Sequence, residues 1–168
     1  ALEACSEHLT QFGGHMYAAG MTLPESKLED FKQAFERAVE NRITERQRTP
    51  EIEVDLELNF DDIDAKFFRL VSQFEPFGPE NPVPVFAIRD LVTRARYVTT
   101  MGKKHEHLKM TVSAVGATRS MVAVGFGLGK YAEELKTGRP FHLVFELSEN
   151  HWNGRTSLQM MIKDLEWA

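Results

Sequence analysis

The chain has 168 residues, 42% hydrophobic and 27% charged, with a formal net charge of −5, which excludes a fibrous or disordered protein and predicts one or two small globular domains. The only cysteine, Cys5, excludes an intramolecular disulfide, and we interpret it as a small buried apolar residue in a reducing, cytoplasmic setting. No apolar run approaches the roughly 18 residues of a membrane span, so no membrane partner is expected.

The first predicted element is a helix over residues 1–11 that ends at a glycine pair in the stretch Phe12–Gly20, FGGHMYAAG. One interpretation is a phosphate-facing loop. In that loop Gly13 and Gly14 adopt positive φ, their N–H groups converge on an anion, and His15 adds a donor or a proton. The alternative is a glycine C-cap followed by a core histidine. Because the helical pattern is already present at residue 1, we expect the chain to be part of a longer protein.

A second helix is predicted from Ser26 to about residue 44, because Ser26 and Glu29 have capping-box spacing and an apolar stripe follows them. Residues 51–60 alternate strictly between apolar and polar side chains, which predicts a half-exposed strand with an anionic face. We interpret that face as solvated.

Three aspartates, Asp61, Asp62 and Asp64, follow the predicted strand. They are metal-ligand candidates by residue type, but without a nearby histidine we expect Asp61 or Asp62 to cap the next helix instead. The proline-rich segment after that helix cannot continue it. We predict an ordered connector there, because Phe77 and Phe86 need to be buried.

From residue 85 the pattern changes to short strands separated by turns, with one short helix near residues 129–137. The Asn153-Gly154 pair is typical of a type I′ hairpin. Five strands with one helix between the third and the fourth is the order of an OB-fold barrel. The predicted strands are about 85–100, 107–115, 120–127, 140–149 and 155–166.

Residues 93–131 form a basic segment in an otherwise acidic chain, with seven basic side chains and one acidic one. This segment covers the first three predicted barrel strands, where such folds usually bind single-stranded nucleic acid. The spacing of His105 and His107 would also suit a metal pair, but no suitable further ligand lies nearby. The predicted cations are Arg94, Arg96, Lys103, Lys104, Lys109 and Arg119, and the predicted stacking planes are Tyr97, His105, His107, Trp152 and Arg155.

Two motifs carry a resemblance that covers essentially the whole chain. FGGHMYAAG resembles the GGH loop of DHH-family phosphoesterases, in the branch of the RecJ-like single-strand exonucleases. Residues 74–86, FEPFGPENPVPVF, are similar to the segment that leads into the OB-fold in that branch. The resemblance implies three parts: an α/β piece over residues 1–50 that ends a DHH-associated domain, a connector over residues 51–84, and an OB-fold over residues 85–168.

The resemblance also implies a function, the binding of single-stranded DNA by the C-terminal portion of a 5′-to-3′ exonuclease of DNA repair and recombination. Members of this family use Mn²⁺ or Mg²⁺ held by a DHH domain, and this sequence contains no Asp-His-His. We therefore expect no metal site and no activity in this chain alone. The resemblance places His15 against the phosphate that is cleaved.

Two alternatives stay open. The chain could belong to a DHH-family phosphodiesterase for short oligonucleotides or cyclic dinucleotides, although an appended OB-fold is unusual there. It could instead be a non-enzymatic adaptor whose OB-fold docks a protein, such as a single-strand-binding protein.

Overall fold

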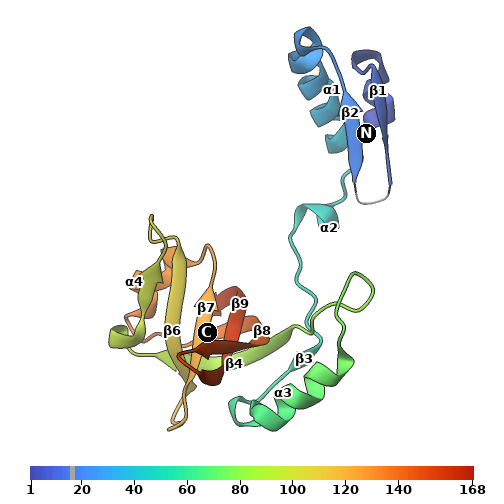
Figure 1. Ribbon diagram of the computed structural model, residues 1–168. Helices are drawn as coiled ribbons and strands as arrows, with labels where there is room; N and C mark the ends of the chain where they lie inside the picture. The colour runs from blue at the N-terminus through green and yellow to red at the C-terminus, as the bar shows by residue number, and fades with distance from the viewer. Residues whose placement is uncertain (16–17) are drawn as a thin grey trace. The chain divides into compact units, whose positions relative to one another are not determined.

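The computed structural model describes residues 1–15 and 18–168 and divides into two units, Ala1–Ile52 and Glu53–Ala168 (Figure 1). Each unit has its own buried core. Within the described residues, every helix is too short or too polar to cross a bilayer.

Unit 1 packs a helix and a 3₁₀ turn around a small core. The elements in chain order are η1 (Leu2–His8), β1 (Gln11–Gly14), β2 (Ala19–Thr22), η2 (Glu25–Lys27), α1 (Leu28–Glu40) and α2 (Glu45–Arg48). Cys5 is fully buried with Phe31 and Ala38, which confirms its expected role as a small apolar residue. Five partly buried side chains on α1 and its neighbours close the core: Leu2, Leu9, Leu23, Ala34 and Phe35.

The glycine pair lies in a β-hairpin, so the predicted helix over residues 1–11 is wrong in its end and in its type. The 3₁₀ helix η1 stops at His8, and Leu9 is already extended. Strand β1 then pairs antiparallel with β2, and Gly13 lies opposite Gly20. The hairpin takes over the backbone hydrogen bonds that a longer helix would have satisfied internally. Two residues of the FGGHMYAAG motif, Met16 and Tyr17, lie outside the described residues.

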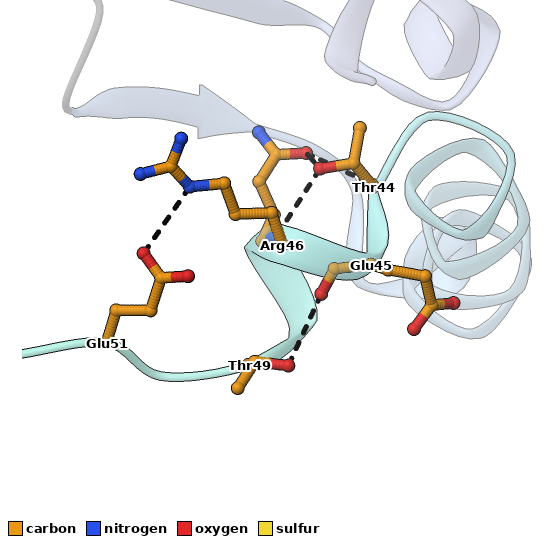
Figure 2. A network of polar contacts seen from close by, with 6 residues as sticks. Thr44, Glu45, Arg46, Thr49 and Glu51 are labelled. Atoms are coloured by element: carbon orange, nitrogen blue, oxygen red, sulfur yellow. Dashed lines mark hydrogen bonds and ion pairs between the residues drawn. The ribbon is translucent and has the colours of Figure 1, made fainter.

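The predicted capping box at Ser26 is also wrong. Ser26 lies inside the 3₁₀ turn η2 that follows the extended Pro24, and α1 begins one residue after its N-cap, Lys27, with no side-chain cap. A capping box instead opens α2, as Figure 2 shows. There the Gln47 N–H donates to Thr44 Oγ1 (3.3 Å) and the Thr44 N–H donates to Gln47 Oε1 (2.9 Å).

The strand predicted over residues 51–60 is reduced to β3 (Leu56–Glu57), which pairs parallel with β4 (Phe86–Thr93). Ile52, Val54 and Leu56 are exposed, whereas Leu58 and Phe60 enter the core of unit 2. The alternating pattern does not extend the strand, because the chain turns into the 3₁₀ helix η3 (Phe60–Asp62) soon after β3. The next helix is therefore capped later than predicted.

Helix α3 (Ala65–Val71) is capped by Asp64, not by Asp61 or Asp62, which lie inside η3. The Phe67 N–H donates to Asp64 Oδ1 at 2.7 Å, and this backbone hydrogen bond lowers the pKa of the Asp64 carboxyl. Helix α3 and the 3₁₀ turn η4 (Ser72–Phe74) lead into the proline-rich segment. There Asn81 Nδ2 donates to the carbonyls of Phe74 (2.8 Å) and Pro76 (3.0 Å).

Five strands close into a barrel. They are β4 (Phe86–Thr93), β6 (His107–Ala114), β7 (Met121–Gly125), β8 (Phe141–Trp152) and β9 (Arg155–Trp167). In the sheet β4 neighbours β8, then come β9, β7 and β6, and a further pairing of β6 with β4 closes the ring. The β7–β9 pair is parallel and the other four pairs are antiparallel, which is the OB-fold arrangement and confirms that prediction.

The connection from β4 to β6 is more broken than the predicted strand over residues 85–100. A 3₁₀ turn, η5 (Ala95–Tyr97), separates β4 from the short edge strand β5 (Thr99–Met101). The turn lets Val98 enter the core. The predicted helix near residues 129–137 is present as η6 (Gly129–Tyr131) followed by α4 (Ala132–Leu135).

Candidate nucleic-acid interface

Strand β6 carries the centre of the candidate interface. Leu108, Met110 and Val112 point into the barrel and are buried. Because side chains alternate along a strand, the residues between them, including Lys109 and Thr111, point outward. The outward side of β6 therefore forms a line that runs from His107 through Lys109 and Thr111 to Ser113.

The outward line continues across the neighbouring strands. Lys109 lies opposite Thr99 on one side and Val124 on the other, and Val124 lies opposite Met161 of β9. The next row leads from Thr111 to Val122 and then to Gln159. Apart from Lys109, the side chains in these two rows are apolar or uncharged. The next residue after Met161 in the first row is Glu146 of β8, whose Oε1 lies 2.7 Å from Lys163 Nζ. Such a surface does not repel a polyanion.

A polar groove of about 410 Å³ lies at the Ser113 end of β6. Arg94 and Tyr97 line it from the β4–β5 connection, together with the hydroxyl-bearing residues Thr111, Ser113, Thr118 and Ser120. The Tyr97 ring is 43% exposed, and the Arg96 guanidinium carbon lies 4.6 Å from its centroid. The structure thus places Arg94 and the Arg96–Tyr97 cation–π pair close together, beside the hydroxyl groups of the groove.

The other end of β6 meets two turns. Lys103 and Lys104 lie in the turn before β6, where the Lys104 N–H donates to Glu106 Oε2 at 2.8 Å. The backbone N–H groups of Glu106 and Lys104 lower the pKa of the Glu106 carboxyl. Phe126 comes directly after β7 and is 65% exposed. Its ring centroid lies 5.1 Å from that of the His107 ring.

Trp152 and Arg155 lie at the tip of the β8–β9 hairpin and face each other across it. Asn153 and Gly154 both have positive φ (47° and 72°), as a type I′ turn requires. The Trp152 side chain is 72% exposed. Gln159 of β9 lies opposite Val122 of β7, and the two strands run in the same direction. The hairpin tip comes before Gln159 in the chain, so it extends past the start of β7, toward the end of β6 where the Tyr97 groove lies.

Arg119 is not a free cation for a ligand, so its assignment as one is corrected. Its guanidinium donates to the Phe60 carbonyl (3.2 Å) and to the Ile63 carbonyl, and it lies 5.7 Å from the Phe60 ring centroid. These acceptors come from the segment before the barrel. Arg119 therefore attaches that segment to the turn between β6 and β7.

In unit 1, His15 is exposed at the end of β1, which rules out a core histidine. Its backbone N–H donates to the Ala18 carbonyl at 2.8 Å. Neither Gly13 nor Gly14 has positive φ, so that part of the prediction is wrong, because both lie in extended hairpin backbone. Gly14 is needed for a different reason, since a Cβ there would collide with the Ala18 carbonyl.

The described part of the chain contains no group of three His, Cys, Asp or Glu side chains placed to hold a metal ion. His105 Nδ1 lies 3.0 Å from Thr100 Oγ1, and His107 Nδ1 accepts the Gly127 N–H at 3.2 Å. The two imidazoles are thus engaged separately and do not form a pair of ligands. The residues present do not fit a Mn²⁺ or Mg²⁺ centre.

Phe126 is an exposed aromatic residue beside β6 that the sequence analysis did not identify. Its only sequence signal is a large side chain between two glycines, Gly125 and Gly127, at the end of a strand. Phe126 lies in the predicted strand 120–127 and is in step with Val122 and Val124, so its sequence position does not distinguish it from an ordinary apolar strand residue. Its orientation depends on residues from the preceding hairpin and is visible only in the structure.

Comparison with known protein families also identifies an OB domain in this chain. Residues 54–164 match the family model of the RecJ OB domain. The single-stranded-DNA-specific exonuclease RecJ of Bacillus subtilis (strain 168) is 34% identical over 170 residues, covering 99% of this chain and 21% of that protein. The corresponding exonuclease of Salmonella typhimurium is 29% identical over 157 residues, which cover 94% of this chain and 26% of that protein.

A solved structure gives the same fold. The crystal structure of RecJ in complex with Mn²⁺ from Thermus thermophilus matches 99% of this chain and 23% of its own, with a TM-score of 0.70 and 23% identity. This chain spans between 21% and 26% of the length of the two exonucleases named above. Since the family model covers well over half of its residues, the chain belongs to the RecJ OB domain family.

Proposed function

We propose that this chain binds single-stranded DNA on the outer face of β5, β6 and β7, as the substrate-binding portion of a single-stranded-DNA-specific exonuclease. The observation that carries the proposal is the line of outward side chains on β6. It has Lys109 at its centre, the Arg94–Tyr97 groove at one end and the Lys103–Lys104 turn at the other. A flexible single strand can follow such a line with its phosphates on the cations and its bases on the aromatic rings.

The charge distribution supports this face over the others. The outer surface of β4, β8 and β9 has a smaller groove of about 220 Å³ lined by Arg89, Asp164 and Glu166. Arg89 there is already paired with Glu57 at 3.0 Å. Among the described residues Arg94 and Lys109 form no ion pair, so a polyanion meets positive charge on this face and carboxylates on the opposite side.

The catalytic part of the proposal rests on the longer relatives, which are named single-stranded-DNA-specific exonucleases. Unit 1 would be the end of a DHH-associated domain, and the Mn²⁺ or Mg²⁺ ions would be held by residues outside this chain. His15 is exposed next to the Gly13–Gly20 pair, where the absence of Cβ atoms leaves open space beside the backbone. We assign His15 and the adjoining Gly13 and Gly14 to the phosphate that is cleaved. We further propose a single-strand-binding protein as a second partner.

Titration of the chain with labelled single-stranded DNA and with duplex of equal length tests the binding proposal. If about four phosphates are neutralised, log K should fall with log salt at a slope near −3, at about −0.7 per contact. Replacing Arg94, Arg96 and Lys109 together by Ala should flatten the slope to about −1. The matched control replaces Arg69, Arg89 and Lys136 by Ala, which removes the same charge from other surfaces of unit 2.

Equal flattening in both triple variants would contradict the assignment of this face. The absence of single-strand binding even at low salt would contradict the proposed function and favour a protein-docking adaptor. Tighter binding to duplex than to single strand would also contradict it.

A further inference from the structure

We infer that Phe126 is a stacking platform for one unpaired base of single-stranded DNA, distinct from the Arg94–Tyr97 groove. This inference rests on the proposed function and adds a ligand site to it. The ring is 65% exposed in a turn and contributes nothing to the buried core, so its apolar area lies in water until a ligand covers it. A nucleobase is a flat apolar ligand with polar edges that matches an exposed ring beside cations.

The Phe126 ring is held in position by its neighbour. It meets the His107 imidazole at a centroid distance of 5.1 Å and an interplanar angle of 77°, the edge-to-face arrangement that aromatic pairs prefer. The imidazole is itself fixed, because its Nδ1 accepts the Gly127 N–H at 3.2 Å. The ring therefore loses little conformational freedom when a base stacks on it.

The backbone of the turn is also fixed. The Gly129 N–H donates to the Glu106 carbonyl at 2.9 Å, which ties the segment after β7 to the start of β6. Gly129 packs so closely on the His105 carbonyl that a Cβ would collide with it, and a Cβ on Gly125 would lie 2.6 Å from Leu128 Cδ1. The platform is thus part of a tightly packed corner of the barrel.

The surroundings suit a nucleotide. Lys103 and Lys104 lie in the neighbouring turn, and the Glu106 carboxylate near them accepts the Lys104 N–H at 2.8 Å. Along β6, His107 beside Phe126 is four residues from Thr111 in the groove with Tyr97, or about 13 Å at roughly 3.3 Å per residue. Two rings that far apart stack on different bases, with Lys109 between them.

The test compares Phe126→Ala with Phe74→Ala, because Phe74 is 68% exposed in the same unit but lies on the segment before the barrel. Fluorescence anisotropy with a short oligothymidylate should show affinity lowered about 5- to 150-fold by Phe126→Ala and unchanged by Phe74→Ala. Phe126→Trp should bind at least as well as the wild type. The slope of log K against log salt should not change in Phe126→Ala, because no phosphate contact is lost.

A scan of single abasic positions in the oligonucleotide identifies the stacked base. An abasic site at one position should weaken binding to the wild type, and the same abasic site should not weaken binding to Phe126→Ala any further. Phe126→Leu keeps an apolar contact with His107 but has no aromatic face, so it should also bind weakly; this variant decides the matter if the Ala variant does not fold. Wild-type affinity in both variants would overturn the platform while leaving the proposed function intact, whereas a wild type that does not bind would overturn the proposed function itself.

Discussion

Arg119→Ala should destabilise unit 2 strongly without weakening DNA binding per folded molecule. The guanidinium donates to two carbonyls, those of Phe60 and Ile63, whose side chains are buried in the barrel core. A hydrogen bond to a charged group contributes about 1.5–3 kcal/mol. Because Arg119 is only half-buried and water can replace part of what is lost, we expect about 2–4 kcal/mol in total.

Tryptophan fluorescence during urea unfolding measures this effect, since the chain's only two tryptophans, Trp152 and Trp167, both belong to unit 2. Arg119→Lys should recover less than half of the loss, because one ammonium group cannot reproduce the two-pronged contact. Lys109→Ala is the matched control and should unfold as the wild type does. The reasoning fails if Arg119→Ala stays within about 0.5 kcal/mol of the wild type, the usual range for surface substitutions, and weakens single-strand binding as Arg94→Ala does.

Three further predictions concern positions elsewhere in the chain. Trp152→Ala should weaken single-strand binding by about 1–3 kcal/mol, and oligonucleotide should quench the emission of the wild type; emission unchanged by DNA would count against stacking at the hairpin tip. In the longer exonuclease that we propose, His15→Ala should lower kcat by about 10² to 10³ with the unfolding midpoint unchanged, because His15 is exposed; lost stability with retained activity would show a structural histidine. Gly129→Ala should destabilise unit 2 by about 1–3 kcal/mol through its collision with the His105 carbonyl. Gly78→Ala, where a Cβ meets open space, is the control for urea unfolding.

The barrel was predictable from sequence because its strands alternate along most of their length. In β6 the buried Leu108, Met110 and Val112 are separated by outward residues, so period and burial agree. The hairpin of unit 1 was not predictable in the same way. Gly13 and Gly14 have weak strand propensity and end a helical pattern, and only their pairing with residues after position 18 makes them a strand.

The candidate interface was predicted as a region but not residue by residue. The charge count located the basic segment; in the structure Arg94 and Tyr97 line the groove at one end of β6, and Lys109 lies on that strand opposite Thr99. Arg119 was misassigned because its acceptors, Phe60 and Ile63, lie 56 to 59 residues earlier in the chain. A side chain bound to distant backbone carbonyls has the same sequence signature as a free cation.

The net charge of −5 is compatible with DNA binding because the charges are separated in space. Opposite faces of a packed β structure are about 10 Å apart at the backbone, and the outward side chains add to that distance. The Debye length is about 8 Å at physiological ionic strength. Asp164 and Glu166 on the far face are therefore screened from the DNA strand that we propose along β6 beside Lys109, so the local charge, and not the net charge, would govern that binding.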